Sequence, residues 1–395
     1  MAARHIIAKQ GGLSYEDEIA FGVTPAGTGT RLHRAENIVF KPALNMIPVE
    51  AKKTGDMLGV EPFIVGGYGG ELTFDLPLHT MGGAESPVTA LLQSCGMKVV
   101  SVAADATGII AGSAAGTLVM LEGDIGNIVV GSGILHDSAA GTDSLRYVER
   151  VEVDTPTATD TTLHMNANWA TTPAASDGWA AMDTLMPSSD IPTTLSFHVF
   201  HGSGATDILE MELGGCAGTA VIPATEAGAL PKVSFTFMVD RWDPTEATLA
   251  QTAFAGNEAA PLLGDSFLMD GTDVATKSIG FNPGLEIVAL NAVSGTNGRA
   301  GYKHVDSIAK LEILPRHDVD LLTKLEAGTV FDGMFSSVQS LTDAWGLWIP
   351  AAQILSYENG DVDGLLRPTM DIQATDLGMN ADDTQIPQWA ISITK

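Results

Sequence analysis

The sharpest chemical pattern in the sequence is residues 359–364, Asn-Gly-Asp-Val-Asp-Gly. Oxygen ligands stand at alternate positions and a glycine takes the sixth, as in calcium loops of the EF-hand type. Such a loop needs a bidentate acid at its twelfth position, which is Met370 here. It also needs flanking helices, whereas the flanking residues alternate as strands do. The segment is therefore predicted to be the turn of a β-hairpin, and calcium binding is the alternative.

Other residues that do chemistry lack the spacing that catalysis or metal binding requires. His198 and His201 lie three apart in a predicted strand, so their side chains point to opposite faces and do not share a metal. The sequence contains no nucleophile elbow, Walker loop, His-Glu-x-x-His or Cys-x-x-Cys. Three glycine clusters lack the final glycine of a dinucleotide fingerprint: residues 27–29, 66–70 and 131–133. We therefore predict no catalytic, cofactor-binding or metal residues, although absent motifs do not exclude an enzyme, because β-rich hydrolases often build their sites from scattered residues.

The cysteines and the apolar segments indicate where the protein is made. Cys95 and Cys216 are too few for a disulfide framework or a zinc site. The N-terminal residues lack the apolar core of a signal peptide. The longest nearly uncharged run, residues 108–121, is too short and too rich in glycine and serine to span a bilayer. These features predict a protein made in a cytosol, with no membrane partner.

The composition favours a β protein with little affinity for nucleic acid. Forty-three glycines and only 17% charged residues among 395 are typical of many short strands joined by tight turns. The net charge of −28 argues against a nucleic-acid binder, which needs a basic face. It suits a protein along which DNA passes without being held, although acidity that merely keeps a protein dispersed is the alternative. Residues 151–231 contain no lysine or arginine, whereas residues 1–53 are net positive.

Residues 66–96 are the best-defined structural unit. In residues 71–78 apolar and polar side chains alternate, which predicts a half-buried strand. A short helix follows, with Ser86 as N-cap, Pro87 at the first helical position and Gly96 at the end. Cys95 lies on the apolar stripe of this helix, so we predict that it is buried.

The rest of the chain divides into regions that differ in strand length and in the composition of their turns. We predict an N-terminal arm at residues 1–20 and a long loop at residues 41–61. Short strands with small-residue turns predict an inserted β domain at residues 98–185. Long strand pairs return after residue 186, with short helices at residues 244–251 and 318–325. The fold class is therefore mainly β, a sandwich or barrel with one to three short helices and an inserted small β domain.

The order of these features resembles the tail tube proteins of long-tailed, non-contractile bacteriophages. The likeness covers most of residues 15–97 and 190–376. Four stretches carry it: Glu-Ile-Ala-Phe-Gly-Val-Thr-Pro-Ala at 18–26, the strand at 69–76 with its following helix, Gly-Cys-Ala-Gly at 215–218 paired with Phe-Thr-Phe at 235–237, and the closing hairpin with Ile-Pro-Ala-Ala at 349–352.

The resemblance implies a structural role in a virion tail. It implies hexameric rings stacked head to tail, whose joined inner sheets form a DNA channel. Residues 1–97 and 186–395 would form the tail-tube domain, with residues 98–185 on the outside of the tube. The implied partners are other copies of the chain, a tape-measure protein, and tail terminator and tail tip proteins, assembled in the host cytoplasm. The family has no catalytic residues.

Two sets of residues are expected to serve this assembly. The loop at 41–61 and the N-terminal arm are expected to dock on the acidic underside of the next ring, since the two ends differ in charge. The channel wall is expected to be mainly acidic. The candidate inter-ring contacts are Met46, Ile47, Lys52, Lys53, Met57 and Leu58, and the candidate lumen-facing residues are Glu71, Thr73 and Asp75.

Two other classes of protein fit the composition. One is a related stacking tube, such as that of a gene transfer agent or a secretion needle, or a tail completion subunit. The other is a β-rich protein that binds or degrades a polysaccharide. Rings or tubes in negative-stain micrographs favour an assembly subunit, and compact particles favour the polysaccharide class.

Overall fold

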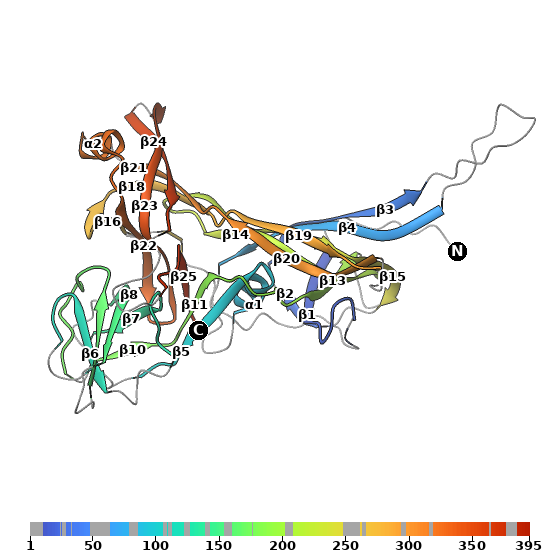
Figure 1. The fold of residues 1–395 in the computed structure, drawn as a ribbon, viewed down its shortest axis with the longest axis horizontal. Helices are drawn as coiled ribbons and strands as arrows, with labels where there is room; N and C mark the ends of the chain where they lie inside the picture. The colour runs from blue at the N-terminus through green and yellow to red at the C-terminus, as the bar shows by residue number, and fades with distance from the viewer. Residues whose placement is uncertain are drawn as a thin grey trace, which may run out of the picture.

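The computed structural model confirms a mainly β fold (Figure 1). It describes the chain except for residues 1–10, 24, 26–28, 33, 48–63, 79–85, 106–108, 110–112, 122–126, 139–142, 154–159, 176, 202–207, 248–260, 263–265, 294–297, 316–318, 363–364 and 377–384. Within the described part, antiparallel strands predominate and two helices are present, α1 Pro87–Ser94 and α2 Val319–Ala327.

The centre of the molecule is a sandwich of two sheets. One sheet consists of β3, β4, β14 and the middle of β13, and the other of β2, β1, β12, the start of β13 and β15. The bounds are β1 Gly11–Asp17, β2 Thr30–Leu32, β3 Glu36–Ile47, β4 Ile64–Pro77, β12 Leu195–His201, β13 Ile208–Glu226, β14 Lys232–Val239 and β15 Arg241–Ala247.

Aromatic side chains fill the sandwich. The ring of Phe74 stacks on those of Phe235 and Phe237, with centroids 5.2 and 5.9 Å apart. Phe197 from the facing sheet meets Phe74 edge-on. All four are buried, so these rings form the centre of the largest hydrophobic core.

The predicted strand–helix unit is confirmed. β4 alternates buried and half-buried side chains through residues 71–76. The Ser86 hydroxyl accepts a hydrogen bond from the Val88 N–H at 3.3 Å, and Pro87 opens the helix. Gly96 has φ +86°, the left-handed conformation that ends helices. Leu91 and Leu92 are buried in the same core as β4, so α1 packs against the inner face of the sheet.

A second group of strands forms the lobe at the upper left of Figure 1, with α2 at its edge. It begins on β13, because Ile222 and Thr225 pair with β18. The strands are β16 Ser266–Met269, β17 Thr272–Val274, β18 Thr276–Asn282, β21 Lys310–Pro315, β22 Phe331–Ser340, β23 Asp343–Val362, β24 Leu365–Ala374 and β25 Ala390–Thr394. A separate hairpin of β19 Leu285–Asn291 and β20 Arg299–Ser307 lies beside the sandwich.

The inserted β domain exists, but its predicted bounds of 98–185 were too wide. Its five strands form one sheet in the order β10-β7-β8-β9-β6. β5 Met97–Val102 and β11 Met182–Pro187 pair with each other, and β11 also pairs with β25, so both belong to the main body. The inserted strands are β6 Thr117–Leu121, β7 Gly133–Asp137, β8 Ser144–Val153, β9 Asp160–Met165 and β10 Gly178–Ala180.

Two predicted irregular segments are partly strands. The arm at 1–20 was wrong for its second half, because β1 pairs with both β12 and β2 and buries Leu13 and Tyr15. The loop at 41–61 was wrong at its start, because β3 continues to Ile47, which pairs with Ile64. Pro42 misled the prediction, yet proline is tolerated on an edge strand, and β3 pairs only with β4 among the described strands.

The helix predicted at residues 318–325 is confirmed as α2, whereas residues 244–247, the described part of the helix predicted at 244–251, lie in strand β15. Pro244 lies in β15, directly opposite Met211 of β13. β15 pairs only with β13 among the described strands, so the proline again occupies an edge strand. Tertiary pairing thus overrides the local helical signal.

A buried carboxylate fixes the corner where β13 turns between the two sheets. Glu18 Oε1 accepts hydrogen bonds from the Ser196 hydroxyl and the Gly215 N–H, both at 2.7 Å. Its Oε2 accepts from the Thr194 hydroxyl at 2.7 Å and the Gly22 N–H at 2.9 Å. One side chain thereby joins the end of β1, the start of β12 and the β13 corner.

Replacing Glu18 with alanine is predicted to destabilise the fold strongly. Two hydroxyls and two backbone N–H groups would lose their acceptor, and each unsatisfied buried donor costs about 1–3 kcal/mol. We expect the free energy of unfolding to fall by about 3–5 kcal/mol in urea titrations. Glu358→Ala, on an exposed position of β23, is the control. Equal losses in the two variants would contradict this role of Glu18.

A half-buried carboxylate joins the inserted domain to the body. Asp332 on β22 accepts hydrogen bonds from the Trp348 indole N–H at 2.5 Å and from the Asn166 amide at 3.2 Å. Burial raises the pKa of Asp332 from its usual 3.8 to about 7, against the opposing effect of these two donors. The folded protein therefore keeps a proton on Asp332 that the unfolded chain has already lost.

The stability of the fold is predicted to depend on pH through Asp332. Because the folded pKa is the higher one, the contribution of this group is fully favourable below about pH 4 and is lost as the pH rises to about 7. Relative to Asp332→Asn, the wild-type free energy of unfolding should fall by roughly 2–4 kcal/mol across this window. Denaturant titrations from pH 4 to 8 measure the difference, and parallel curves for the two proteins would contradict it.

Candidate assembly surfaces

The predicted lumen-facing residues lie together on the outer face of the β3–β4–β14 sheet. Glu71, Thr73 and Asp75 project away from the core, since their neighbours Leu72 and Phe74 are buried. The register continues this face across the sheet, with each polar residue of β4 opposite a residue of β14 and of β3. We call this surface the polar face; its described members are Glu36, Val39, Lys41, Glu71, Thr73, Asp75, Lys232, Ser234, Thr236 and Met238.

The charges on the polar face are largely paired. Lys41 Nζ lies 2.9 Å from a carboxylate oxygen of Glu71, its direct cross-strand neighbour. Lys232 Nζ lies 2.6 Å from a carboxylate oxygen of Glu36. Both lysines of the polar face therefore have an acidic partner. The surface is closer to neutral than the expected acidic wall, because three acids face two lysines.

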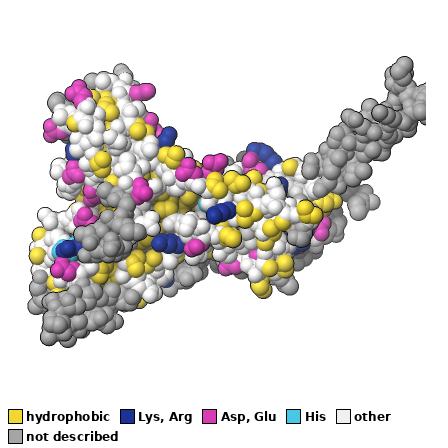
Figure 2. Space-filling view, in the orientation of Figure 1, with side chains coloured by type: hydrophobic (Ala, Val, Ile, Leu, Met, Phe, Trp, Pro, Cys, Tyr) yellow, Lys and Arg dark blue, Asp and Glu magenta, His cyan; other side chains and the backbone are white. Residues whose placement is uncertain are grey.

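The third carboxylate and the threonines complete the polar face. Asp75 accepts hydrogen bonds from the Ser234 hydroxyl and the Asn37 amide, both at 2.6 Å. Thr73 stands opposite Thr236, which in turn stands opposite Thr219 of β13. The face therefore presents short hydroxyl side chains and paired charges, without a deep pocket or a cluster of cations. In Figure 2, lysine and arginine side chains are scattered over the visible surface and form no broad patch.

The β3–β4 hairpin projects from the sandwich, away from both the lobe and the inserted domain (Figure 1). Of the predicted inter-ring contacts, Met46 and Ile47 lie in β3, although only their backbone is described. The remaining four, Lys52, Lys53, Met57 and Leu58, lie outside the described residues. Two of the six predicted contacts thus lie in a strand of the projecting hairpin.

An aromatic patch that was not predicted from the sequence lies at the base of this hairpin. The Trp242 ring packs edge-on against Phe40 and Tyr68, with centroids 6.4 and 5.8 Å away. Tyr68 is 46% exposed and the nearby Leu44 is 40% exposed. Apolar residues at 40, 42 and 44 were the available signal, but 42 and 44 fell in a segment predicted to be a loop. Exposed apolar groups beside a projecting hairpin indicate a contact surface.

The candidate calcium segment is part of a β-hairpin, as predicted. Asn359 and Asp361 lie in β23 and pair with Pro368 and Leu366 of β24, respectively. Asp363 and Gly364 lie outside the described residues. Among the residues that the structure describes, no group of three or more histidine, cysteine or acidic side chains is arranged to hold a metal ion.

The histidines and cysteines singled out in the sequence are structural. His198 is buried, and its Nδ1 lies 2.6 Å from a carboxylate oxygen of Glu210, while His201 ends the same strand. Cys95 and Cys216 are free thiols and fully buried, and burial raises the pKa of each well above its usual value. Thiols in this state are poor nucleophiles.

Comparisons with known proteins do not assign a family. No protein-family model matches the chain, and no curated protein matches it. Among the described residues, neither helix has the length and apolar character needed to cross a bilayer.

Alanine substitution is predicted to lower the free energy of unfolding more on the buried face of β4 than on its polar face. Leu72→Ala should lower the free energy of unfolding by about 2–5 kcal/mol, because it opens a cavity in the core. Thr73→Ala, the adjacent residue on the polar face, should cost about 1 kcal/mol or less. Chemical denaturation of the two variants measures the contrast. Equal costs would show that the polar face is packed within the subunit and is not available for assembly.

Proposed function

We propose that the chain is a structural subunit that assembles into stacked rings and forms the tube of a viral tail. The observation that carries this proposal is the combination, in one sheet, of a long edge without a partner among the described strands, a polar outer face and a projecting hairpin. These three features provide for ring closure, for a channel wall and for contact between rings. Hexameric symmetry and the tail proteins as partners come from the resemblance to tail tube proteins.

The edge of β3 is suited to ring closure. β3 is 12 residues long and pairs only with β4 among the described strands, so its other edge offers backbone hydrogen-bonding groups. Natural proteins cover or shorten such edges, because they pair readily with other chains. A neighbouring copy that covers the edge satisfies those groups, and repetition around an axis closes the sheet into a barrel.

The polar face is suited to line a channel for DNA. A polyanion adheres to a surface when cations of that surface displace its counterions. On the polar face both lysines, Lys41 and Lys232, are already paired with carboxylates. DNA that passes such a wall meets hydroxyl groups and neutralised charges, so it is neither bound tightly nor strongly repelled.

One observation favours the polysaccharide class as the second candidate. A hollow of about 540 Å³ at the hairpin base is lined by Tyr68, Trp242, Glu212, Arg241 and Asp243. Exposed aromatic rings beside carboxylates are able to stack on sugar rings and accept hydrogen bonds from their hydroxyls. Binding of a purified polysaccharide by calorimetry, together with loss of binding in Trp242→Ala, would favour this candidate over the tube.

Shortening the hairpin is predicted to prevent rings from stacking into tubes. Residues 43–69 would be replaced by Asn-Gly, which joins the paired residues Pro42 and Gly70 by a two-residue turn. We expect the wild-type protein to form tubes in negative-stain micrographs and the variant to yield soluble subunits or single rings. Unchanged thermal unfolding of the variant is the control for folding. Compact, unassembled wild-type particles at all concentrations would contradict the proposed function.

A further inference from the structure

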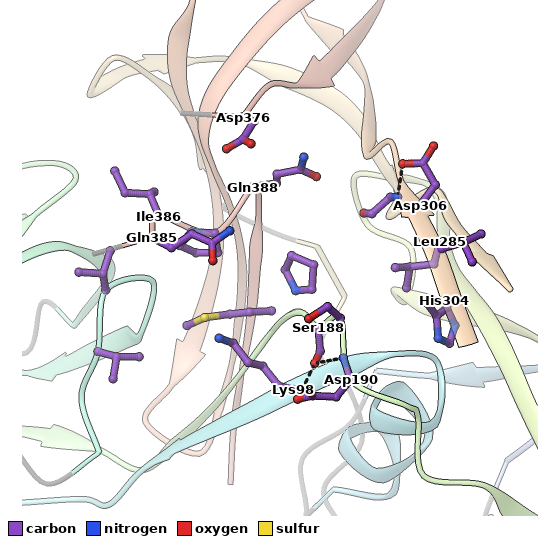
Figure 3. A pocket seen from close by; sticks show the side chains of 18 residues that line it. Lys98, Ser188, Asp190, Leu285, His304, Asp306, Asp376, Gln385, Ile386 and Gln388 are labelled. Atoms are coloured by element: carbon purple, nitrogen blue, oxygen red, sulfur yellow. Dashed lines mark hydrogen bonds between the residues drawn. The ribbon is translucent and has the colours of Figure 1, made fainter. Parts of the chain in front are cut away.

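A groove of about 650 Å³ lies where four parts of the chain meet (Figure 3). Its walls come from β5 and the end of β11, from the β19–β20 hairpin, from residues 385–388 and from Val129 and Val130 of the inserted domain. The volume is typical of pockets that bind a small ligand or a few residues of a peptide. The groove is distinct from the polar face and the projecting hairpin.

The groove combines negative charge with exposed apolar walls. Asp190, Asp306 and Asp376 line it from three sides, and Lys98 is the cation on its wall (Figure 3). Burial lowers the pKa of His304, which also lines the groove, so that its imidazole is neutral at pH 7. The described lining is therefore net negative.

Apolar side chains lie between these charges. Val129 of the inserted domain and Val305 of the β19–β20 hairpin are 42% and 55% exposed, and Ile386 and Pro387 also line the groove. A complementary ligand is an extended peptide with apolar residues at its centre and basic residues at its ends. Burial of the exposed apolar side chains against such a peptide provides affinity, and the carboxylates favour a peptide with basic residues.

We propose that this groove binds residues 4–9, Arg-His-Ile-Ile-Ala-Lys, of a second copy of the chain. This proposal rests on the proposed stacking of subunits. The segment has the required pattern, because Arg4 and Lys9 flank Ile6 and Ile7. The first 15 residues contain no acid, although the whole chain has a net charge of −28. Charge complementarity therefore favours this segment over most others of the same chain.

The position of the segment favours binding between copies. Residues 1–10 lie outside the described residues, but Gly11 begins β1 opposite His201. The chain enters the described structure at the end of the sandwich from which the β3–β4 hairpin projects, whereas the groove lies beside β5 and β11, toward the inserted domain (Figure 1). A ten-residue segment spans at most about 33–36 Å when extended. It is thus well placed to reach another copy stacked at that end.

Disulfide formation between two singly substituted full-length chains tests the proposal. Ile7→Cys and Val305→Cys chains are mixed and mildly oxidised, and linked pairs are separated by non-reducing electrophoresis. The native thiols give little background, because both are buried. The matched control replaces Val305→Cys with Val288→Cys, which is 42% exposed on the same hairpin but does not line the groove. We expect at least tenfold more linked pair with Val305→Cys, and less when Asp306→Lys is added to that chain.

Micrographs of the same mixtures distinguish the failure of this proposal from the failure of the proposed function. Rings or tubes with equal linkage at Val305→Cys and Val288→Cys would show that stacking is correct and the groove is not the receptor. Stronger linkage of Val305→Cys to Met57→Cys than to Ile7→Cys would overturn the proposal in favour of the hairpin tip. Absence of any assembly would overturn both proposals.

Discussion

The continuous strand β13 organises the other strands of the molecule, because three groups of them pair with it. Its 19 residues pair in succession with β12 and β15, with β14, and with β18, so that three groups of strands are built on one backbone. The turn between the first two groups is made at Gly215, whose φ of +65° and contact with Asp240 leave no room for a side chain. Glu18 stabilises this corner by accepting a hydrogen bond from the Gly215 N–H.

The assembly surfaces follow from this arrangement. Because β13 pairs with β14, and β14 pairs with β4, the β3–β4 hairpin is the last part of its sheet, and among the described strands one edge of β3 is unpaired. The aromatic core fixes which side of that sheet faces inward, so the polar side chains of β4 are left on the outside. α1 packs against the inner face of the sheet, and the β19–β20 hairpin contacts β13, where His304 Nε2 lies 3.1 Å from the Gly218 carbonyl oxygen. A rigid sheet with a free edge and a solvated face is suited to be one segment of a larger barrel.

The sequence predicted the local units well, because their signals are local. Alternation in β4, the Ser86 cap, Pro87 and Gly96 each act within a few residues, and each was confirmed. Glu71, Thr73 and Asp75 were correctly placed on one face for the same reason. The hairpin interpretation of residues 359–364 also needed only neighbouring residues.

Predictions that depended on distant pairing were less successful. Pro42 was interpreted as part of a loop and Pro244 as the start of a helix, but each occupies an edge strand, which only the pairing of distant strands reveals. The bounds of the inserted domain were too wide because β5 and β11 look like its other short strands and differ only in their partner. The pairing of Lys232 with Glu36, which makes the polar face less acidic than expected, joins residues 196 positions apart. No local pattern could show it.

Electron cryomicroscopy of the assembled particle can decide whether the subunits form a tube. We expect stacked rings around an open channel, with the β3–β4–β14 sheet continuous between neighbouring subunits and Glu71, Thr73 and Asp75 facing the channel. The hairpin should contact the next ring. A particle without a channel, or one in which the polar face is turned to the outside or buried between subunits, would contradict it.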